Sequence, residues 1–183
     1  MAVIRRYDRR QDSVQAADSN LINTPERLRT FAQQKGLRIV PPFDVEGVVN
    51  ALGIEIKKEN IKDDLSGVLR KSPESSKWEM LINAKHHPNR QRYTMAHELG
   101  HYCLHRHIQI EFEDRIFFRG GESNKEEMQA NSFASEVLMP DSDFRKMVHD
   151  GKNKIDDLAQ EFGVSTLALR IRAKNLGMSG HGL

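Results

Sequence analysis

A helix that carries two histidines four residues apart is the feature that most constrains this chain. The sequence predicts this helix from about Asn89 to about Arg106, around the motif His97-Glu98-Leu99-Gly100-His101. The helix is apolar over much of its circumference, as expected of a helix in a protein core. Its apolar residues are Tyr93, Met95, Ala96, Leu99, Cys103 and Leu104. Burying two imidazoles and a carboxylate there without partners would be costly, and a metal ion is a partner that removes this cost.

The spacing of the motif favours zinc chemistry. His97 and His101 lie on one face of a helix, one turn apart, so both imidazoles can reach a single tetrahedral zinc ion. Glu98 between them can accept the proton of a water that zinc activates for attack on a peptide carbonyl. The alternative is an exposed, charged helix face in which a motif of three fixed positions has arisen by accident. The apolar surroundings disfavour that alternative, and the sequence predicts a zinc site.

A catalytic zinc ion needs three protein ligands and one open position, so a third ligand is expected outside the motif. Glu127 is the favoured candidate, because it lies early in another predicted helix whose small residues would allow a close approach. His107 has the spacing of the long metzincin motif, but Leu104 stands where that motif has a glycine for a sharp turn. His105 continues the same helix face one turn further on, which suits a role behind the ligands or as a gate.

The helix that carries Glu127 has a predicted start and end. Ser123, followed three residues later by Glu126, forms a capping box, which gives Glu126 a structural role and separates it from Glu127. The apolar stripe of this helix consists of Met128, Phe133, Ala134, Val137 and Leu138, and Pro140 ends it. Asp141 is expected to cap a short helix that ends near Gly151.

The length and composition of the chain exclude several classes of protein. A chain of 183 residues can build one core of ordinary size, and a net charge of +2 does not predict nucleic-acid binding by the whole molecule. The single cysteine, Cys103, excludes a disulfide within the chain and a cysteine-rich zinc site. The basic N-terminus has no apolar segment of a secretory signal, and no window has the length of a membrane span. We therefore expect a cytoplasmic protein without membrane partners.

The N-terminal part of the chain is expected to hold a mobile polar arm at residues 1–23, followed by two helices. Thr24 is a suitable N-cap for the first helix, with Pro25 at its first position. Asp44 begins the second, whose apolar stripe runs to Leu52, and Gly53 ends the helix. Three short strands are predicted next, at Ile54 to Lys57, Leu65 to Arg70 and Trp78 to Ile82, and they indicate a small, mainly antiparallel sheet.

The last part of the chain has the pattern of a helix-turn-helix. The stretch from Ile155 to Ser165 matches its first half, with a turn around Gly163 and a cap at Ser165. Arg170, Arg172 and Lys174 give the second helix positive charge, but three acidic residues offset it on the first, whereas DNA binders usually show a stronger basic footprint. A packing or substrate-recognition module is therefore preferred over direct DNA binding.

Two segments of the chain resemble a known family. The stretch Arg92-Tyr93-Thr94-Met95-Ala96-His97-Glu98-Leu99-Gly100-His101-Tyr102 is similar to the active-site helix of ImmA/IrrE-type metallopeptidases. The stretch Glu127-Met128-Gln129-Ala130-Asn131-Ser132-Phe133-Ala134, running on to Pro140, is similar to the second signature of that family. The two segments occur in the order and at the separation of the family, and the looser resemblance extends from about Asp44 to Gly177.

The resemblance implies zinc held by His97, His101 and Glu127, with Glu98 as general base and acid. It implies an α+β fold in which a small sheet packs on a zincin-like helical core, followed by a helix-turn-helix-like module. The expected division is a metallopeptidase domain at 24–151, the module at 152–177 and a flexible tail at 178–183. Relatives of this kind cleave repressor or antitoxin proteins, often helix-turn-helix regulators. Because only a short arm precedes Thr24, the expected substrate is a separate protein.

Three functions therefore remain compatible with the sequence. The leading hypothesis is a zinc endopeptidase, in which Tyr93, Tyr102 and His105 are open candidates for stabilising the oxyanion. The second is a DNA-binding regulator with a sensory or vestigial zinc site. The third is a protein-interaction module with a closed, structural zinc site. An open coordination position distinguishes the enzyme from the third, and a salt-dependent gel shift with specific DNA would support the second.

Overall fold

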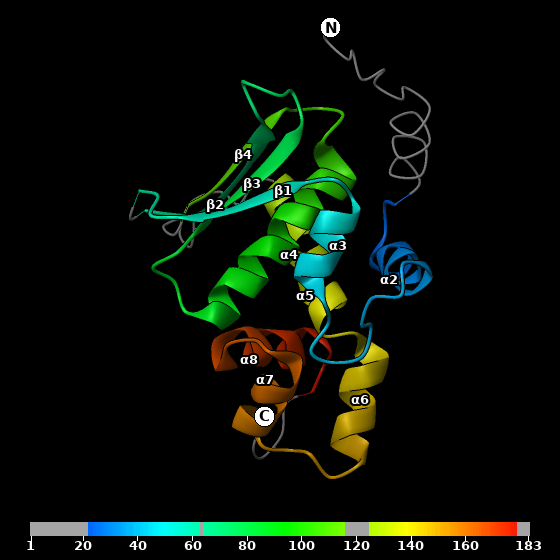
Figure 1. Ribbon diagram of the computed structural model, residues 1–183. Coiled ribbons are helices and arrows are strands. Elements are labelled where there is room, and N and C mark those ends of the chain that lie inside the picture. Colours follow the sequence, from blue (N-terminus) through cyan, green and yellow to red (C-terminus); the bar gives the residue numbers. More distant parts are fainter. Residues whose placement is uncertain (1–21, 63, 116–124, 179–183) are drawn as a thin grey trace, which may run out of the picture.

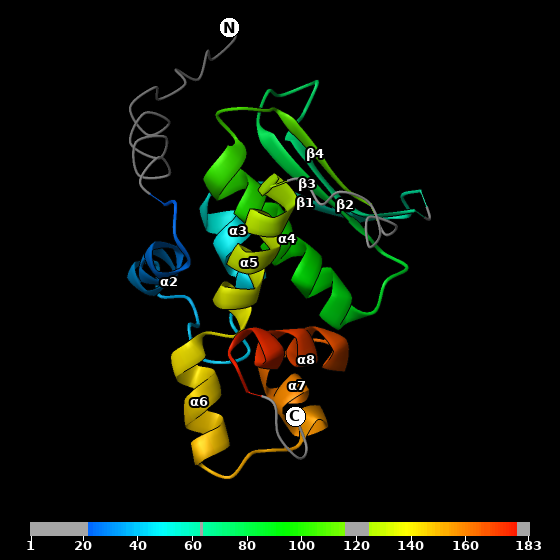
Figure 2. The same ribbon diagram turned by 180° about the vertical axis from the view of Figure 1, so that it is seen from behind.

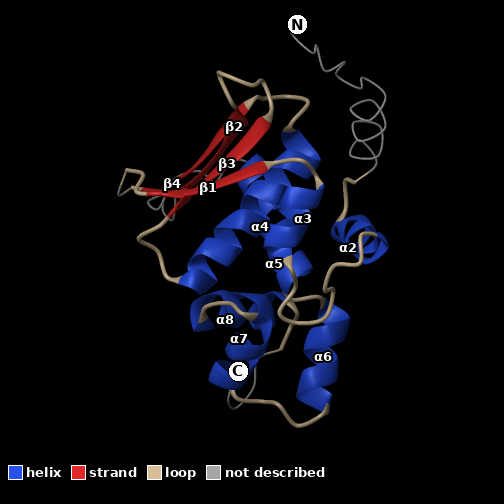
Figure 3. Cartoon of the chain, in the orientation of Figure 1, coloured by secondary structure: helices blue, strands red, loops and turns tan. Residues whose placement is uncertain are grey.

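The computed structural model describes residues 22–62, 64–115 and 125–178. Within them the chain is α+β, with seven helices and one four-stranded sheet (Figures 1 and 3). The helices are α2 (Pro25–Gln34), α3 (Val45–Ala51), α4 (Pro88–His105), α5 (Lys125–Leu138), α6 (Asp141–His149), α7 (Ile155–Phe162) and α8 (Thr166–Asn175). The strands are β1 (Glu55–Glu59), β2 (Leu65–Lys71), β3 (Trp78–Asn83) and β4 (Glu111–Arg115).

Several predicted helix starts are confirmed by the hydrogen bonds of their capping residues. The Thr24 hydroxyl accepts from the backbone N–H of Arg27 at 3.3 Å, and Pro25 opens α2. Asp44 accepts from the N–H of Gly47 at 2.9 Å and begins α3. For α6 the prediction was wrong by one position: Pro140 occupies the N-cap, and Asp141 is the first residue of the helix. An acidic residue there still interacts well with the helix dipole.

The sheet has the order β1-β3-β2-β4 and is mixed. β2 runs antiparallel to both β3 and β4, whereas β1 lies parallel to β3. The expectation of a mainly antiparallel sheet missed this parallel pair, and β4 was not predicted at all. The first predicted strand is also displaced, because it covers Glu55–Glu59 rather than Ile54 to Lys57.

A buried carboxylate ties three strands together. Glu79 on β3 is 1% exposed and accepts hydrogen bonds at 2.7 Å from Lys57 on β1 and from Arg70 on β2. The hydrogen bond from Lys57 lowers the pKa of Glu79, against the effect of burial, and Arg70 acts in the same direction. This ion cluster is consistent with β3 lying between β1 and β2, the arrangement that makes the sheet mixed.

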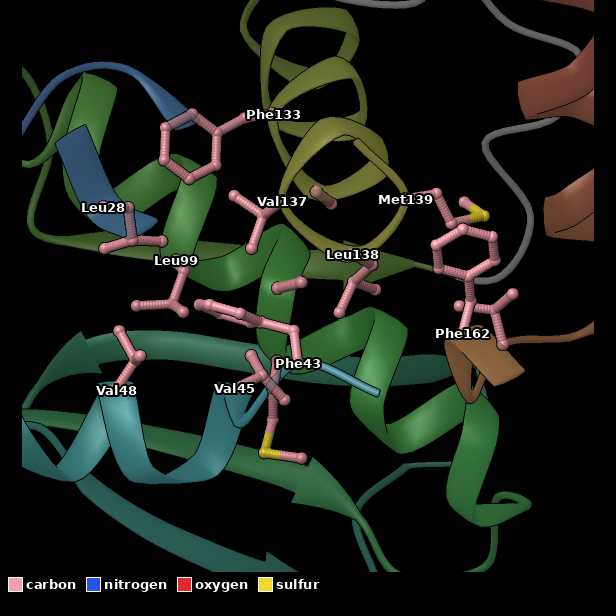
Figure 4. Packing of buried hydrophobic residues seen from close by; sticks show 14 of the residues in the cluster. Leu28, Phe43, Val45, Val48, Leu99, Phe133, Val137, Leu138, Met139 and Phe162 are labelled. Carbon is pink, nitrogen blue, oxygen red and sulfur yellow. The ribbon is translucent and has the colours of Figure 1, made fainter. Parts of the chain in front are cut away.

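The central helix α4 lies between the sheet and α5. It contacts β2 and β3 on one side and α5 on the other, and Figure 2 shows α5 on the side of α4 that faces away from the sheet. Figure 4 shows Leu99 of α4 among the buried side chains of α2, α3 and α5. The other labelled members of this cluster are Leu28, Phe43, Val45, Val48, Phe133, Val137, Leu138, Met139 and Phe162. The core therefore fixes α4 on both sides.

The C-terminal helices α7 and α8 are joined by a short turn and are anchored on the rest of the chain. Gly163 ends α7 at a φ of +64°, a conformation that favours glycine, and Ser165 caps α8 by accepting from the N–H of Ala168 at 3.1 Å. The Arg92 side chain donates to the carbonyl of Gly163 at 3.1 Å, and that of Asn89 donates to the carbonyl of Val164 at 3.0 Å. The turn therefore rests on the first turns of α4.

Arg172 does not contribute to a basic surface, contrary to the interpretation of the sequence. It is 7% exposed, forms an ion pair with Glu136 of α5 and donates to the carbonyl of Met139 at 2.9 Å. On α8 this leaves Arg170 and Lys174 exposed among the three cations considered. The buried arginine ties α8 to the end of α5.

Three predictions fall on residues that the structure does not describe. They are most of the polar arm at 1–23, the capping Ser123 and most of the tail at 178–183. No helix among the described residues is both long and apolar enough to cross a membrane.

Candidate metal centre

Helix α4 brings the two histidines of the motif together. Nε2 of His97 and Nε2 of His101 lie 3.1 Å apart, and each residue is 2% exposed. The helical repeat places them on one face, one turn apart, and their ring planes meet at 75°. Two ring nitrogens that point at the same space, away from bulk water, could form one side of a metal site.

Helix α5 supplies a carboxylate to the same space. The Glu127 oxygens lie 3.3 Å from Nε2 of His97 and 3.1 Å from Nε2 of His101. One ligand atom from each of the three residues lies within 4.8 Å of the others. The side chain of Glu127 is 32% exposed, so the site opens to solvent on the side of α5. The third ligand favoured from the sequence is thus placed beside the two histidines.

A close approach between α4 and α5 makes this convergence possible. A Cβ atom added at Gly100 would lie 2.9 Å from Cα of Ala130 and 3.0 Å from its carbonyl oxygen. These distances are shorter than an ordinary van der Waals contact. Ala130 lies one turn after Glu127 on α5, so the contact at Gly100 sets how near the carboxylate comes to the histidines.

The three donors fit a zinc ion in number, chemistry and spacing. Zinc bonds of about 2.0–2.1 Å in a tetrahedral arrangement require ligand atoms roughly 3.3–3.4 Å apart. The observed separations of 3.1–3.3 Å are close to that requirement. Two imidazoles and one carboxylate form a donor set of known catalytic zinc sites and leave one position open. The residues present therefore suit a catalytic metal.

The electrostatics of the centre also suit a cation. Burial lowers the pKa of His101, and the hydrogen bond with Glu127 offsets this only in part, so the imidazole stays neutral as a metal ligand must. Burial alone would raise the pKa of Glu127, but its hydrogen bonds with His101 and His97 outweigh that effect and hold it well below the ordinary value. The carboxylate is therefore ionised at neutral pH.

Glu98 lies buried between the ligand-bearing face of α4 and the sheet. It is 0% exposed, and β2 comes so close that a Cβ added at Gly67 would lie 3.1 Å from Oε1 of Glu98. The same Cβ would lie 2.5 Å from Cγ2 of Thr94, one turn earlier on α4. Gly67 thus leaves the space in which the carboxylate of Glu98 lies.

A comparison with protein families matches most of the chain. Peptidase M78, described as the IrrE N-terminal-like domain, matches residues 49–174. The chain belongs to this family. The match includes α4 and α5, and therefore Glu98 and the three residues that could hold a metal. No curated protein matches the chain. The resemblance found in the sequence is confirmed, and membership of Peptidase M78 supports a metallopeptidase-type function.

The other two ligand candidates, His105 and His107, are not among the three residues of this Peptidase M78 domain whose ligand atoms converge. His107 follows the end of α4 and is exposed. His105 is 3% exposed, but its Nδ1 faces Nδ1 of His101 at 3.2 Å, whereas Nε2 of His101 faces His97 and Glu127. The two alternatives are therefore not favoured by the geometry, and His105 lies behind a ligand.

The tyrosines proposed for the oxyanion lie in different surroundings. Tyr102 packs edge-on against Trp78 of β3, with ring centroids 5.6 Å apart, and the guanidinium of Arg106 lies over its ring. The Tyr93 hydroxyl lies 3.5 Å from the carbonyl of Asn131, beside the side chain that contacts His97. Tyr93 thus contacts a residue that itself contacts His97, whereas Tyr102 contacts Trp78 and Arg106.

Three neighbours of the centre were not assigned a role from the sequence. The Asn131 side chain contacts Nδ1 of His97 at 3.2 Å, and that of Gln129 contacts Nε2 of His105 at 3.1 Å. Phe112 of the unpredicted strand β4 stacks on His101, with centroids 4.6 Å apart and planes at 23°. The sequence places Asn131 on the same helix face as Glu127, four residues later, but this spacing alone gave it no role of its own.

Proposed function

We propose that this protein is a zinc-dependent endopeptidase that hydrolyses a peptide bond in a protein substrate. The observation that carries the proposal is the meeting of His97, His101 and Glu127, with ligand atoms within 4.8 Å, beside the buried carboxylate of Glu98. Membership of a peptidase family supports the same conclusion. Zinc is the proposed ion because its ligand number, donor types and spacing match these three residues.

The proposal gives His97, His101, Glu127 and Glu98 two kinds of role. His97, His101 and Glu127 hold the ion and leave one position open towards solvent, because Glu127 is the partly exposed member. When bound, zinc lowers the pKa of a water to about 7 and polarises a carbonyl. Glu98 accepts the proton from the attacking water and returns it to the leaving amine. Its burial next to Gly67 keeps that carboxylate in one place.

The proposed substrate is a separate helix-turn-helix repressor or antitoxin, whose cleavage would regulate transcription. The support is the resemblance of the two signature segments to ImmA/IrrE-type peptidases, whose substrates are regulators of this kind. We further propose that the protein acts in the cytoplasm, where such regulators are found.

We assign α7 and α8 to packing and substrate recognition rather than to DNA binding. Arg172 is buried against Glu136 and Met139, and the turn at Gly163 is fixed on Arg92, so the pair is held rigidly on the peptidase domain. Its remaining cations on α8 are Arg170 and Lys174. Two cations form a small basic footprint for a DNA-binding helix. A salt-dependent gel shift that is lost on reversing both charges would instead support the regulatory alternative.

The decisive experiment is co-incubation with the regulator encoded next to this protein, followed by mass spectrometry of the fragments. Wild type should cleave it, while a chelator or the variant Glu98→Gln should abolish cleavage. Glu98→Gln should still bind zinc, because Glu98 is not a ligand in the proposal, whereas Glu127→Gln should lose both zinc and cleavage. Glu126→Gln is the matched control, since it makes the same change at the neighbouring position and should retain both.

The controls separate the parts of the proposal. Full activity of Glu98→Gln would remove Glu98 from the mechanism. Cleavage that survives complete removal of metal would refute a metallopeptidase. Zinc binding without cleavage of any protein, in a site whose fourth position is closed, would favour a structural zinc site.

A further inference from the structure

A row of hydrogen-bonding side chains extends from the metal-binding face into the space behind it. Nδ1 of His101 lies 3.2 Å from Nδ1 of His105, and Nε2 of His105 lies 3.1 Å from Oε1 of Gln129. The two histidines are one turn apart on α4, and Gln129 comes from α5. His101 and His105 are 2% and 3% exposed, so bulk water does not compete for the contact between them.

The chemistry of imidazole fixes the direction of every bond in this row. A histidine that binds a metal through Nε2 carries its proton on Nδ1, so His101 can only donate to His105. His105 must then accept through Nδ1, which leaves its own proton on Nε2. That N–H points at Oε1 of Gln129, which can only accept. Each contact thus pairs one donor with one acceptor, and no other assignment does so with His101 bound to a metal.

The second ligand on α4 has an equivalent partner. Nδ1 of His97 lies 3.2 Å from Oδ1 of Asn131, so the proton that metal binding leaves on Nδ1 meets an acceptor. Asn131, like Gln129 and Glu127, lies on α5. Helix α5 therefore provides a carboxylate for the ion and two side-chain amide oxygens. One contacts His97, and the other contacts His105 behind His101.

Phe112 holds the row in place from the side of the sheet. Its ring stacks on His101 and lies near His105, with centroids 6.3 Å apart and planes at 42°. Because Phe112 is 4% exposed, it restricts rotation of both imidazoles without offering a competing hydrogen bond.

We propose that His105 and Gln129 are positioning residues that hold His101 in the tautomer and ring orientation needed to bind the metal. The inference rests on the proposed zinc site, and it assigns to α5 a second function besides supplying Glu127. His105 acts as a relay, because it accepts from the ligand and donates to the amide. Gln129 ends the relay and selects the tautomer of His105. Partners of this kind typically change metal affinity about 10–100-fold when removed.

Gln129 allows a clean test, because its exposed position on α5 means that truncation leaves the core intact. Gln129→Ala should weaken zinc binding about tenfold or more in a competition titration with a chromogenic chelator. Gln129→Glu keeps an acceptor at this position and should bind zinc within a few-fold of wild type. Gln160→Ala is the matched control, since Gln160 is an exposed glutamine on helix α7. The zinc affinity of this variant should equal that of wild type.

Long-range ¹H–¹⁵N correlation spectra of the zinc-loaded full chain give a readout that does not depend on activity. They should show His105 protonated on Nε2 and accepting on Nδ1 in wild type. In the metal-free chain, where zinc no longer fixes the proton of His101, the same histidine should populate both tautomers in Gln129→Ala and remain protonated on Nε2 in Gln160→Ala. A purely structural role of Gln129 would leave the tautomer of His105 unchanged.

Two results would overturn the relay while leaving the peptidase proposal in place. One is a proton on Nδ1 of His105 in the zinc-loaded wild type, because that nitrogen could not then accept from His101. The other is zinc affinity of Gln129→Ala equal to wild type. The expected tautomers and affinities together with no proteolysis would support the relay and count against the proposed function. A wild-type chain that binds no zinc would refute both.

Discussion

Adding one methyl group at Gly100 should disturb both the stability and the metal affinity of this protein. The Cβ of Gly100→Ala would lie 2.9 Å from Cα of Ala130 and 3.0 Å from its carbonyl oxygen. Both atoms belong to the backbone of α5, so no side chain can rotate out of the way. To restore an ordinary contact of 3.4 Å or more, α4 and α5 must separate by roughly 0.5 Å.

The cost of that separation can be estimated from the packing. Extra methyl groups in a close-packed core cost about 1–3 kcal/mol, and replacing a helical glycine by alanine returns up to about 1 kcal/mol. With the full return, we expect Gly100→Ala to lower the free energy of unfolding by up to about 2 kcal/mol. The displacement also moves Glu127, one turn from Ala130, away from two nitrogens that now lie 3.1 and 3.3 Å from its oxygens. Zinc should bind at least about tenfold more weakly, or ~1.4 kcal/mol.

Thermal unfolding with and without zinc separates the two effects. The metal-free comparison reports the packing cost, and the rise in Tm on adding zinc reports the affinity. The double variant Gly100→Ala with Ala130→Gly should not recover, because the nearest atoms of Ala130 are in its backbone. Ser132→Ala, a truncation at an exposed position of α5, serves as the control. If Gly100→Ala matched wild type in both measurements, the helix contact would not be what positions Glu127.

Three further outcomes are expected. Gly67→Ala would place a Cβ 3.1 Å from Oε1 of Glu98, so turnover of the substrate should fall several-fold or more while zinc affinity, measured separately, stays close to wild type. Burial raises the pKa of Cys103 to about 12. The folded protein should therefore resist alkylation at pH 8 and keep its activity in iodoacetamide. Rapid labelling of Cys103 without unfolding would contradict this prediction. The hydrogen bond from Lys57 holds the pKa of Glu79 below its ordinary value, so its stabilisation is present above about pH 4.5 and is lost as the pH falls through the lower folded value. Urea unfolding of Glu79→Gln should therefore depend less on pH in that acid range than wild type does.

The parts of the centre that follow from local sequence were predictable. Periodicity placed His97 and His101 on one apolar helix, and capping chemistry located the starts of α2, α3 and α8. Glu127 could be favoured because small residues follow it on α5, and the contact of Gly100 with Ala130 shows the physical basis of that reasoning. Signals of this kind lie within one or two helical turns, where spacing alone decides which side chains share a face.

Features that depend on which elements become neighbours were not predictable from spacing. Alternation in a strand indicates its buried face but not its partner, so the parallel pairing of β1 with β3 and the insertion of β3 between β1 and β2 were missed. The short, charged segment Glu111–Arg115 gave no strand signal, although it carries the ring that stacks on His101. Arg172 is basic in the sequence, yet its pairing with Glu136 depends on how α8 docks on α5.

The proposed metal and the core should have separate tasks in this protein, and removing the metal tests this. Leu99 of α4 and Val137 of α5 are fully buried, and burial of one such side chain contributes about 1.5–3 kcal/mol whether or not an ion is present. Zinc instead adds a term set by its concentration, about 4 kcal/mol when free zinc exceeds Kd a thousand-fold. A chelator should therefore abolish cleavage and lower Tm while the helical circular dichroism at 25 °C remains. Loss of the helical signal under those conditions would mean that the ion, rather than the apolar contacts, holds α4 against α5.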